Sequence, residues 1–331
     1  MSYHIVSIDA ANCSLSCRDG QLTCKSAEGE KKLPLEDVAS IIITSWSAQI
    51  HSELFLQAAK HGVALIICEA FKPVSLVLPA NRSTDTLLSR ALLALPPRTT
   101  AQLWQKTVDA KCANQLSLAE QIAPQDARLA ALRTTALGRK PHKEAICAKA
   151  FWQIFGTATE LKHPLTPALT PDGGEGASAA TESTFTRTRE GGGLNDLLNY
   201  GYAVLLSTVL QKLFGVGLDP TWGISHAPRE RATPLAYDLM EPFRPCVDWR
   251  VFQWVTQHPD PKDWTVTKEY RRWVTGFPLE RVEYLEFTLE IQGVIEGVVR
   301  GFRRAVLENK MGFYRPWMPD GEWPADGGDG G

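Results

Sequence analysis

The sequence predicts an α+β protein in which a small N-terminal β-rich domain is followed by a larger all-α domain. Short apolar runs rich in β-branched residues fill the first 78 residues, whereas from about residue 82 the apolar residues recur at helical spacing. A chain of 331 residues is also long enough for two domains. We therefore expect a β-rich domain over 1–78, a linker over 79–90 and a helical domain over 91–312.

The predicted strands of the first domain are short runs bounded by turn residues. The run "YHIVSID" partly alternates, and "SLSC" and "QLTC" flank the turn "RDG". Three further runs, "VASIIITS", "VALIIC" and "PVSLVLP", are almost continuously apolar. A single helix is expected at "SELFLQAAKHG", with Gly62 ending it in the position that favours glycine.

The helical domain is predicted from segments with a period near 3.6. These are "TDTLLSRALLAL", "TTAQLWQKTVDAKCANQLSLAEQI", "PQDARLAALRTTAL", "HKEAICAKAFWQIF", "LNDLLNYGYAVLLSTVLQKLFG" and "LERVEYLEFTLEIQGVIEGVVRGFRRAVLEN". Residues 157–193 interrupt them with Pro, Gly, Ser, Thr and Ala, which predicts a mobile loop. Residues 313–331 end in "DGEWPADGGDGG" and predict a flexible acidic tail.

Composition excludes several classes of protein. The seven cysteines are an odd number without a C-x-x-C pair, so neither a disulfide framework nor a zinc cage is indicated. The chain has no run of 18 apolar residues and its N-terminus does not resemble a secretory signal, so we expect a cytoplasmic protein without a membrane span. The formal net charge is only −2, but residues 80–150 hold eleven Lys and Arg against five Asp and Glu. This excess is typical either of a phosphate-binding surface or of solvated helix faces.

The stretch "GISHAPRERATPLAYDLMEPFRP", residues 223–245, has a composition that is unusual for a segment kept only for stability. Thr233 is a suitable helix N-cap and Pro234 occupies the first helical position, where proline is favoured. Pro242 lies further along and removes a backbone hydrogen bond at a cost of roughly 3 kcal/mol. We therefore expect the helix to bend there, for a reason other than packing.

Polar side chains gather around this bend. Asp238 and Glu241 are three residues apart and share a helix face, and His226 in the preceding loop can reach the same face. Glu144, at the start of an otherwise apolar helix, is a candidate third ligand. Carboxylates with an imidazole suit Mg²⁺ or Mn²⁺. The alternatives are that Asp238 and Glu241 are ordinary solvated helix acids, that His226 is an ordinary loop histidine, and that Glu144 complements the helix dipole.

Four motifs resemble one known family. "HKEAICAKAFWQIFG", "LNDLLNYGYAVLLSTV", "GLDPTWGISH" and "PLAYDLMEPFRPCVD" occur in the order and approximate spacing of CRISPR-associated protein one, the integrase subunit that inserts new spacers during CRISPR adaptation. The resemblance covers residues 1 to about 310. It implies a catalytic helical domain in which Mg²⁺ or Mn²⁺ is bound by Glu144, His226 and Glu241, with Asp238 as an additional acid. It also places Asn195, Asn199 and Tyr202 on a helix beside the site.

The resemblance further implies the reaction and the partners. A DNA 3′-hydroxyl would attack a phosphodiester of the CRISPR repeat, so that the chain acts as an integrase and endonuclease on double-stranded DNA with 3′ ends. The chain would form a homodimer largely through its β-rich domain, and two dimers would flank a dimer of the small second CRISPR-associated protein. An inactive DNA-binding scaffold of the same family and an unrelated small-molecule metal hydrolase are the rival hypotheses. Basic candidates for contact with the DNA backbone are Arg82, Lys106, Lys111, Lys140, Lys143, Arg229, Arg231 and Arg244.

Overall fold

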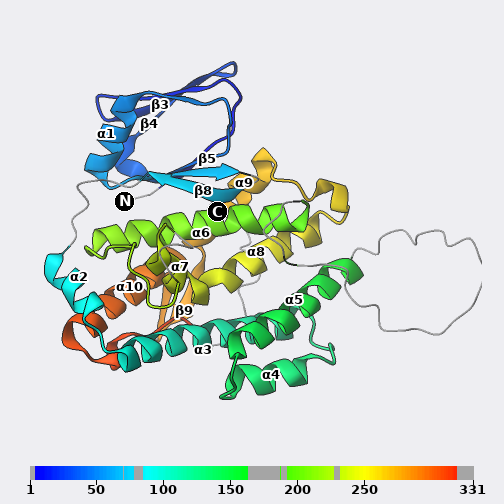
Figure 1. Ribbon diagram of the computed structural model, residues 1–331. Helices are drawn as coiled ribbons and strands as arrows, with labels where there is room; N and C mark the ends of the chain where they lie inside the picture. The colour runs from blue at the N-terminus through cyan, green and yellow to red at the C-terminus, as the bar shows by residue number, and fades with distance from the viewer. Residues whose placement is uncertain are drawn as a thin grey trace, which may run out of the picture.

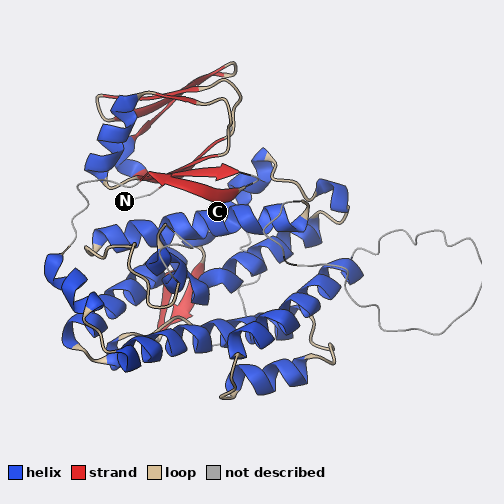
Figure 2. Cartoon of the chain, viewed as in Figure 1, coloured by secondary structure: helices blue, strands red, loops and turns tan. Residues whose placement is uncertain are grey.

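The computed structural model describes residues 4–69, 71–77, 85–162, 187, 192–226 and 232–318. Its fold is α+β, as predicted: the strands of the N-terminal region lie together above a larger body of helices (Figures 1 and 2). None of the helices in these ranges is both long enough and apolar enough to cross a membrane.

Two four-stranded sheets build the N-terminal region. The first has the order β1 (His4–Ile8), β5 (Val38–Ile43), β7 (Ala64–Glu69) and β8 (Lys72–Val77), with only the β7–β8 pair antiparallel. The second has the order β4 (Gly29–Pro34), β3 (Gln21–Ser26), β2 (Ser14–Arg18) and β6 (Gln49–Ile50). Helix α1 (Ser52–His61) ends at Gly62, whose φ of 68° confirms the predicted left-handed stop.

Strand β5 is buried on both faces and joins two hydrophobic cores. Ile41 and Ile43 contribute to a core with β2 and α1, whereas Ile42 contributes to the core of the helical region. Successive side chains of a strand point to opposite faces, which explains the almost unbroken apolar run. Helix α6 (Leu194–Gly215) packs against β5, β7 and β8, so the first sheet lies directly on the helices (Figure 1).

The helical region surrounds α6, which is apolar around most of its circumference and mostly buried. Helices α3 and α5 run together on the side away from the sheets, and α6 contacts α7 and α8 (Figure 1). A short 3₁₀ turn, η2 (Glu241–Phe243), separates α7 from α8, as expected from the proline at 242. The remaining helices are α2 (Thr86–Leu93), α3 (Pro97–Ile122), α4 (Leu129–Leu137), α5 (Lys143–Lys162), α7 (Pro234–Met240), α8 (Arg244–Gln257), α9 (Lys268–Thr275) and α10 (Ile291–Glu308).

Two helices extend beyond the bounds expected for the linker and the loop. Helix α2 begins inside the expected linker, because the Asp85 carboxylate accepts hydrogen bonds from the amides of Leu87 and Leu88 and caps the helix. Helix α5 continues to Lys162 and so takes the first residues of the expected loop over 157–193. Most of that loop lies outside the described residues.

The last predicted helix and the tail also need correction. The helix expected over 279–309 starts only at Ile291, and a hairpin of β9 (Arg281–Tyr284) and β10 (Phe287–Glu290) precedes it. The tail expected to be flexible over 313–331 begins with a packed segment, in which Tyr314 and Trp317 are buried. Residues 319–331 lie outside the described part of the chain.

Candidate active site

One face of α3 forms the floor of the candidate site. Trp104 and Lys111 are seven residues apart and therefore lie on the same side of the helix. The ring of His226 lies edge-on to Trp104, with 6.0 Å between the ring centroids. Lys111 is 6% exposed, so its charged end is enclosed by neighbouring elements.

Two glutamates from separate elements meet at the ammonium group of Lys111. Its Nζ lies 2.6 Å from Oε1 of Glu144, in the first turn of α5, and 2.6 Å from Oε2 of Glu241, the first residue of η2. The side chain of Glu144 is 36% exposed, whereas that of Glu241 is 4% exposed. The carboxylate pair is therefore open to solvent on the Glu144 side and closed on the Glu241 side.

The charges around Glu241 keep it ionised. Burial alone would raise the pKa of Glu241, but the positive charges of Arg244 and Lys111 outweigh burial and lower it to about 2. A protonated His226 ring would lower the pKa of Glu241 further. Burial would lower the pKa of the Lys111 ammonium, but Glu241 and Glu144 raise it above its ordinary value. The carboxylates of Glu144 and Glu241 thus lie on either side of the Lys111 ammonium group.

His226 is held by Asp238, which is fully buried. The oxygens of Asp238 accept the backbone N–H groups of Ile224, Ser225 and His226 at 2.6, 3.1 and 3.1 Å. Nδ1 of the His226 ring lies 2.7 Å from Oδ1 of the same carboxylate. A carboxylate only accepts, so Nδ1 carries the proton and Nε2 keeps its lone pair in the neutral ring.

The local sequence explains why the loop can approach Asp238 so closely. A Cβ added to Gly223 would lie 2.8 Å from Oδ2 of Asp238 and 2.7 Å from the carbonyl oxygen of His226. Only glycine fits there without a shift. Thr233 occupies the predicted N-cap position before Pro234, but its hydroxyl makes no capping hydrogen bond, and the amide of Leu235 donates to the Pro220 carbonyl.

The turn that carries Glu241 is fixed from α3. Asn114, three residues after Lys111 on the same helix, donates from Nδ2 to the Pro242 carbonyl at 2.6 Å and to the Trp317 carbonyl at 3.0 Å. Phe243 stacks on Trp317, with 5.9 Å between the ring centroids. Nothing in the sequence indicated this role of Asn114, because an asparagine within a long helix forms no distinct pattern.

The residues suit a divalent cation, although they are arranged around an ammonium group. Within the described ranges, no three His, Cys, Asp or Glu side chains are placed to share a metal ion. Oε2 of Glu241 is nevertheless buried and receives no well-aligned hydrogen bond, in spite of the short distance to Lys111. Two carboxylate oxygens of this kind beside an imidazole are donors that Mg²⁺ and Mn²⁺ accept. By donor type, Glu144, His226 and Glu241 therefore fit Mg²⁺ or Mn²⁺.

A second polar cluster lies behind Glu241 and contains the predicted supporting residues. Arg187 donates to the side-chain oxygens of Asn195 and Asn199, each at 2.9 Å. The guanidinium groups of Arg187 and Arg244 lie 5.3 and 4.7 Å from the centre of the Tyr202 ring. The Tyr202 hydroxyl donates to buried Asp248. Nothing in the sequence had indicated Asp248.

Most described members of the predicted DNA-binding set have partners inside the protein. The Lys106 ammonium donates to the carbonyls of Met311 and Tyr314, and Lys143 pairs with Asp109 at 2.5 Å. Lys111 bridges the two glutamates, and Arg244 pairs with Glu241 at 3.3 Å. Helical spacing alone does not show which cations have partners inside the protein, and contact of these side chains with DNA stays a prediction. Lys140 is exposed, and Arg82, Arg229 and Arg231 lie outside the described residues.

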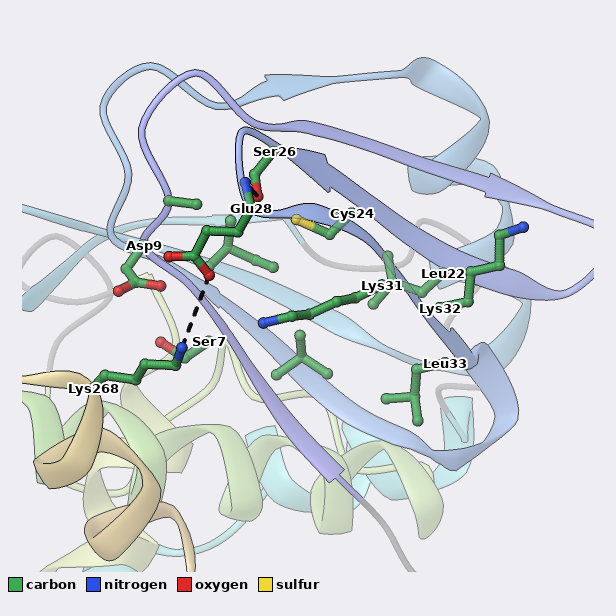
Figure 3. Close-up of a pocket in the computed structure, with 13 residues that line it drawn as sticks. Ser7, Asp9, Leu22, Cys24, Ser26, Glu28, Lys31, Lys32, Leu33 and Lys268 are labelled. Atoms are coloured by element: carbon green, nitrogen blue, oxygen red, sulfur yellow. Dashed lines mark hydrogen bonds and ion pairs between the residues drawn. The ribbon is translucent and has the colours of Figure 1, made fainter.

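Two hollows of the structure lie apart from these acids. One, of about 290 Å³, is bordered by β1, β3 and β4 and is spanned by an ion pair between Glu28 and Lys268 at 3.9 Å (Figure 3). The other, of about 680 Å³, lies between the end of α6 and α10. Its arginines pair with acids, as Arg303 does with Asp85. Neither hollow contains Glu144, His226 or Glu241.

Known proteins match this chain over most of its length. The sequence model of the family described as "CRISPR associated protein Cas1" matches residues 6–275. The CRISPR-associated endonuclease Cas1 of Neisseria meningitidis serogroup C (strain 8013) is 30% identical over 244 residues, which are 72% of this chain and 71% of the relative. That of Korarchaeum cryptofilum (strain OPF8) is 28% identical over 263 residues, or 75% and 76% of the two chains.

Solved structures share the fold. A casposase bound to its integration product superposes with a TM-score of 0.73 at 20% identity, over 98% of this chain and 96% of that one. A Cas1 protein from Thermotoga maritima superposes with a TM-score of 0.65 at 13% identity, over 93% and 97%. Identities this low show the fold alone. Since the family's sequence model covers most of the residues, the chain belongs to the Cas1 family of CRISPR-associated proteins.

Proposed function

We propose that this chain is a metal-dependent DNA integrase and endonuclease that inserts new spacers into a CRISPR array. The observation that carries the proposal is the meeting of Glu144 and Glu241 at the Lys111 ammonium group, with His226 near enough to act on the charge of Glu241. The names of its relatives support an endonuclease. The casposase with a similar fold, which is bound to an integration product, supports DNA joining.

Glu144, Glu241 and Nε2 of His226 would hold Mg²⁺ or Mn²⁺. When bound, the ion supplies Lewis-acid stabilisation of the charge that develops on the attacking, leaving and non-bridging oxygens of a phosphodiester. We assign Asp238 to positioning instead of direct ligation, because its oxygens already accept three amides and the imidazole. Asn114 would keep Glu241 in place through the Pro242 carbonyl.

The DNA backbone would be bound by exposed cations near the opening of the site. Lys140 is exposed three residues before α5 begins, and Arg82, Arg229 and Arg231 remain candidates from the sequence. Such contacts are mainly electrostatic, so DNA affinity should fall by orders of magnitude between about 50 and 200 mM salt. An affinity that does not change over this range would favour a small-molecule hydrolase.

The proposal includes the partners. The β-rich region would form the homodimer, and Trp46, Leu56 and Val74 are large apolar side chains exposed on it by 82, 60 and 54%. Two such dimers would flank a dimer of the small second CRISPR-associated protein in the cytoplasm. A Cas6-RT-Cas1–Cas2 complex and a TtCas1–DNA complex are among the structures with a similar fold. Co-purification with the small partner followed by mass measurement tests this assembly.

Strand transfer tests the reaction itself. The natural chain should join a labelled duplex with 3′ ends to a supercoiled target in Mn²⁺. Glu144→Gln and Glu241→Gln should each lower the strand-transfer rate at least 100-fold, about the effect of removing a group that stabilises transition-state charge. Glu296→Gln is the matched control, since Glu296 lies on α10 and pairs with Lys212 of α6 and with Arg300. Equal rates in all four proteins would refute the proposed site. DNA binding without any strand transfer would indicate the inactive scaffold.

A further inference from the structure

Lys111 is an unusual lysine because its charge is enclosed in the middle of a helix and shared between two acids. A buried ammonium group is costly unless it is paired and hydrogen-bonded. Here it lies 2.6 Å from one oxygen of Glu144 and 2.6 Å from one oxygen of Glu241, and its side chain is 8% exposed. No other described element contributes a cation at the point where these two oxygens meet.

The position of this ammonium group is the position in which the two carboxylates would share a divalent ion. Two carboxylates this close repel each other unless a positive charge lies between them. An ammonium group and a divalent ion cannot occupy one point between the same oxygens, and their like charges repel. We propose that Lys111 is the internal counter-ion of the site: it holds Glu144 and Glu241 together before a divalent cation enters and moves away when the cation binds.

The surroundings allow this exchange. The lysine stem is flexible, and the pair is open toward solvent beside Glu144, which is 36% exposed. Glu241 keeps a second positive neighbour, because Arg244 Nε lies 3.3 Å from Oε1, the oxygen that does not face Lys111. Glu241 is therefore not left as an uncompensated buried charge when Lys111 departs.

The inference rests on the proposed function, because it assumes that a divalent cation binds at Glu144 and Glu241. It goes beyond that function by assigning Lys111 a positioning role that sets how tightly the cation binds. The bound ion must displace a resident charge, so removal of that charge should tighten binding.

The first experiment uses the natural chain and labels its lysines by reductive methylation, followed by mass spectrometry, with EDTA or with Mn²⁺. Methylation of Lys111 should rise severalfold in Mn²⁺, because its ammonium group leaves the two carboxylates. Lys212 provides the control, since it is also a largely buried lysine paired with one glutamate and should react equally in both conditions. Unchanged Lys111 reactivity at saturating Mn²⁺ would overturn the proposal.

The second experiment measures Mn²⁺ affinity from the electron paramagnetic resonance signal of free Mn²⁺. Lys111→Met keeps the volume of the stem without its charge, so its Kd should fall about tenfold or more, while Lys111→Arg and the control Lys212→Met should bind like the natural chain. An unchanged or weaker affinity in Lys111→Met contradicts the inference. If that variant does not fold, the labelling of the natural chain decides alone.

Glu144→Gln separates this inference from the function on which it rests. If Glu144→Gln weakens Mn²⁺ binding but Lys111 neither changes reactivity nor affects affinity, the cation site stands and the role of Lys111 is refuted. If Glu144→Gln binds Mn²⁺ as the natural chain does, the cation lies elsewhere, and both the proposed site and the inference fail.

Discussion

A single buried carboxylate organises the loop that carries the imidazole of the site. Asp238 accepts three consecutive backbone amides and Nδ1 of His226. The sequence placed Asp238 and Glu241 on one helix face, and their spacing suggested that they share a ligand. Helix α7 ends at Met240, however, and a tighter turn begins at Glu241. The two acids therefore find different partners.

Gly223→Ala tests how closely the loop must approach Asp238. The new methyl group would lie under 3 Å from Asp238 Oδ2 and from the His226 carbonyl, so the loop must shift. We expect the free energy of unfolding to fall by about 1–3 kcal/mol and strand transfer to fall with it. Urea unfolding and the strand-transfer rate measure both. Gly293→Ala is the control: its Cβ would meet nothing within 4 Å, and it should be neutral or stabilising.

Asp248 gives stability a dependence on pH. Burial raises its pKa to about 7, despite the hydrogen bond from Tyr202 and the nearby positive charges of Arg244 and Arg187. An acid with a higher pKa in the folded state binds more protons there than when unfolded, so its contribution falls as pH rises from about 4 to about 7. Asp248→Asn removes this dependence. Urea unfolding at several pH values should show that the free energy of unfolding of the variant falls less between about pH 4 and 7 than that of the natural chain, by up to roughly 4 kcal/mol. Equal pH dependence in both proteins would contradict the assignment.

At the scale of elements, one arginine joins the segment before α6 to the helices around the site. Arg187 binds Asn195 and Asn199 on α6, and its guanidinium group lies 5.8 Å from the centre of the Trp152 ring on α5. The planar guanidinium group reaches both asparagines at once, which a lysine cannot do with the same geometry.

Arg187→Lys should therefore lower the free energy of unfolding by about 1–3 kcal/mol while keeping the charge. Arg300→Lys is the matched control, because Arg300 pairs with Glu296 on an exposed helix face and such pairs contribute under about 1 kcal/mol. Chemical unfolding followed by circular dichroism compares the two. Equal effects in both variants would show that Arg187 does not connect these helices.

The sequence predicted most elements, and its errors have physical causes. Strands β5 and β7 were evident because burial on both faces requires continuous apolar runs. Strand β4 was missed because "GEKKLP" is mostly exposed and supplies backbone hydrogen bonds to β3 with few apolar side chains. The hairpin of β9 and β10 was assigned to a helix because its charged and apolar residues fit both periods.

At the scale of the whole molecule, a C-terminal segment crosses α3 and completes the support of the site. Its carbonyls at Met311 and Tyr314 accept from Lys106, and the Tyr314 hydroxyl lies 2.7 Å from that of Thr107. Trp317 stacks on Phe243 and accepts from Asn114. We call residues 311–318 the C-terminal strap.

Removing the strap should destabilise the protein far more than removing residues 319–331 alone. A chain ending at Lys310 loses two fully buried aromatic side chains, each contributing about 3–5 kcal/mol, and we expect its melting temperature to fall steeply. A chain ending at Met318 keeps every contact described above and should melt close to the natural chain. Thermal unfolding of both distinguishes them, and similar melting temperatures would contradict the role of the strap.

The candidate site was predictable only in part. Residue type and helix periodicity indicated Asp238, Glu241 and His226, with Glu144 as a third candidate. The family resemblance selected Glu144, His226 and Glu241, and their binding of a metal stays a prediction. The partners of Lys111 and Asn114 were not predictable, because each contact joins segments more than thirty residues apart and a charged residue within a long helix is usually solvated. Periodicity describes neighbours along a helix, whereas these contacts depend on how separate helices cross.

The strap also has a consequence for biosynthesis. Asn114 lies early in the helical region, but the Trp317 carbonyl that it binds is among the last described groups to be made by the ribosome. The turn bearing Glu241 thus gains its full support only after Trp317 has been made. A nascent chain shorter than 317 residues therefore lacks one of the two carbonyl partners that hold Asn114 beside this turn.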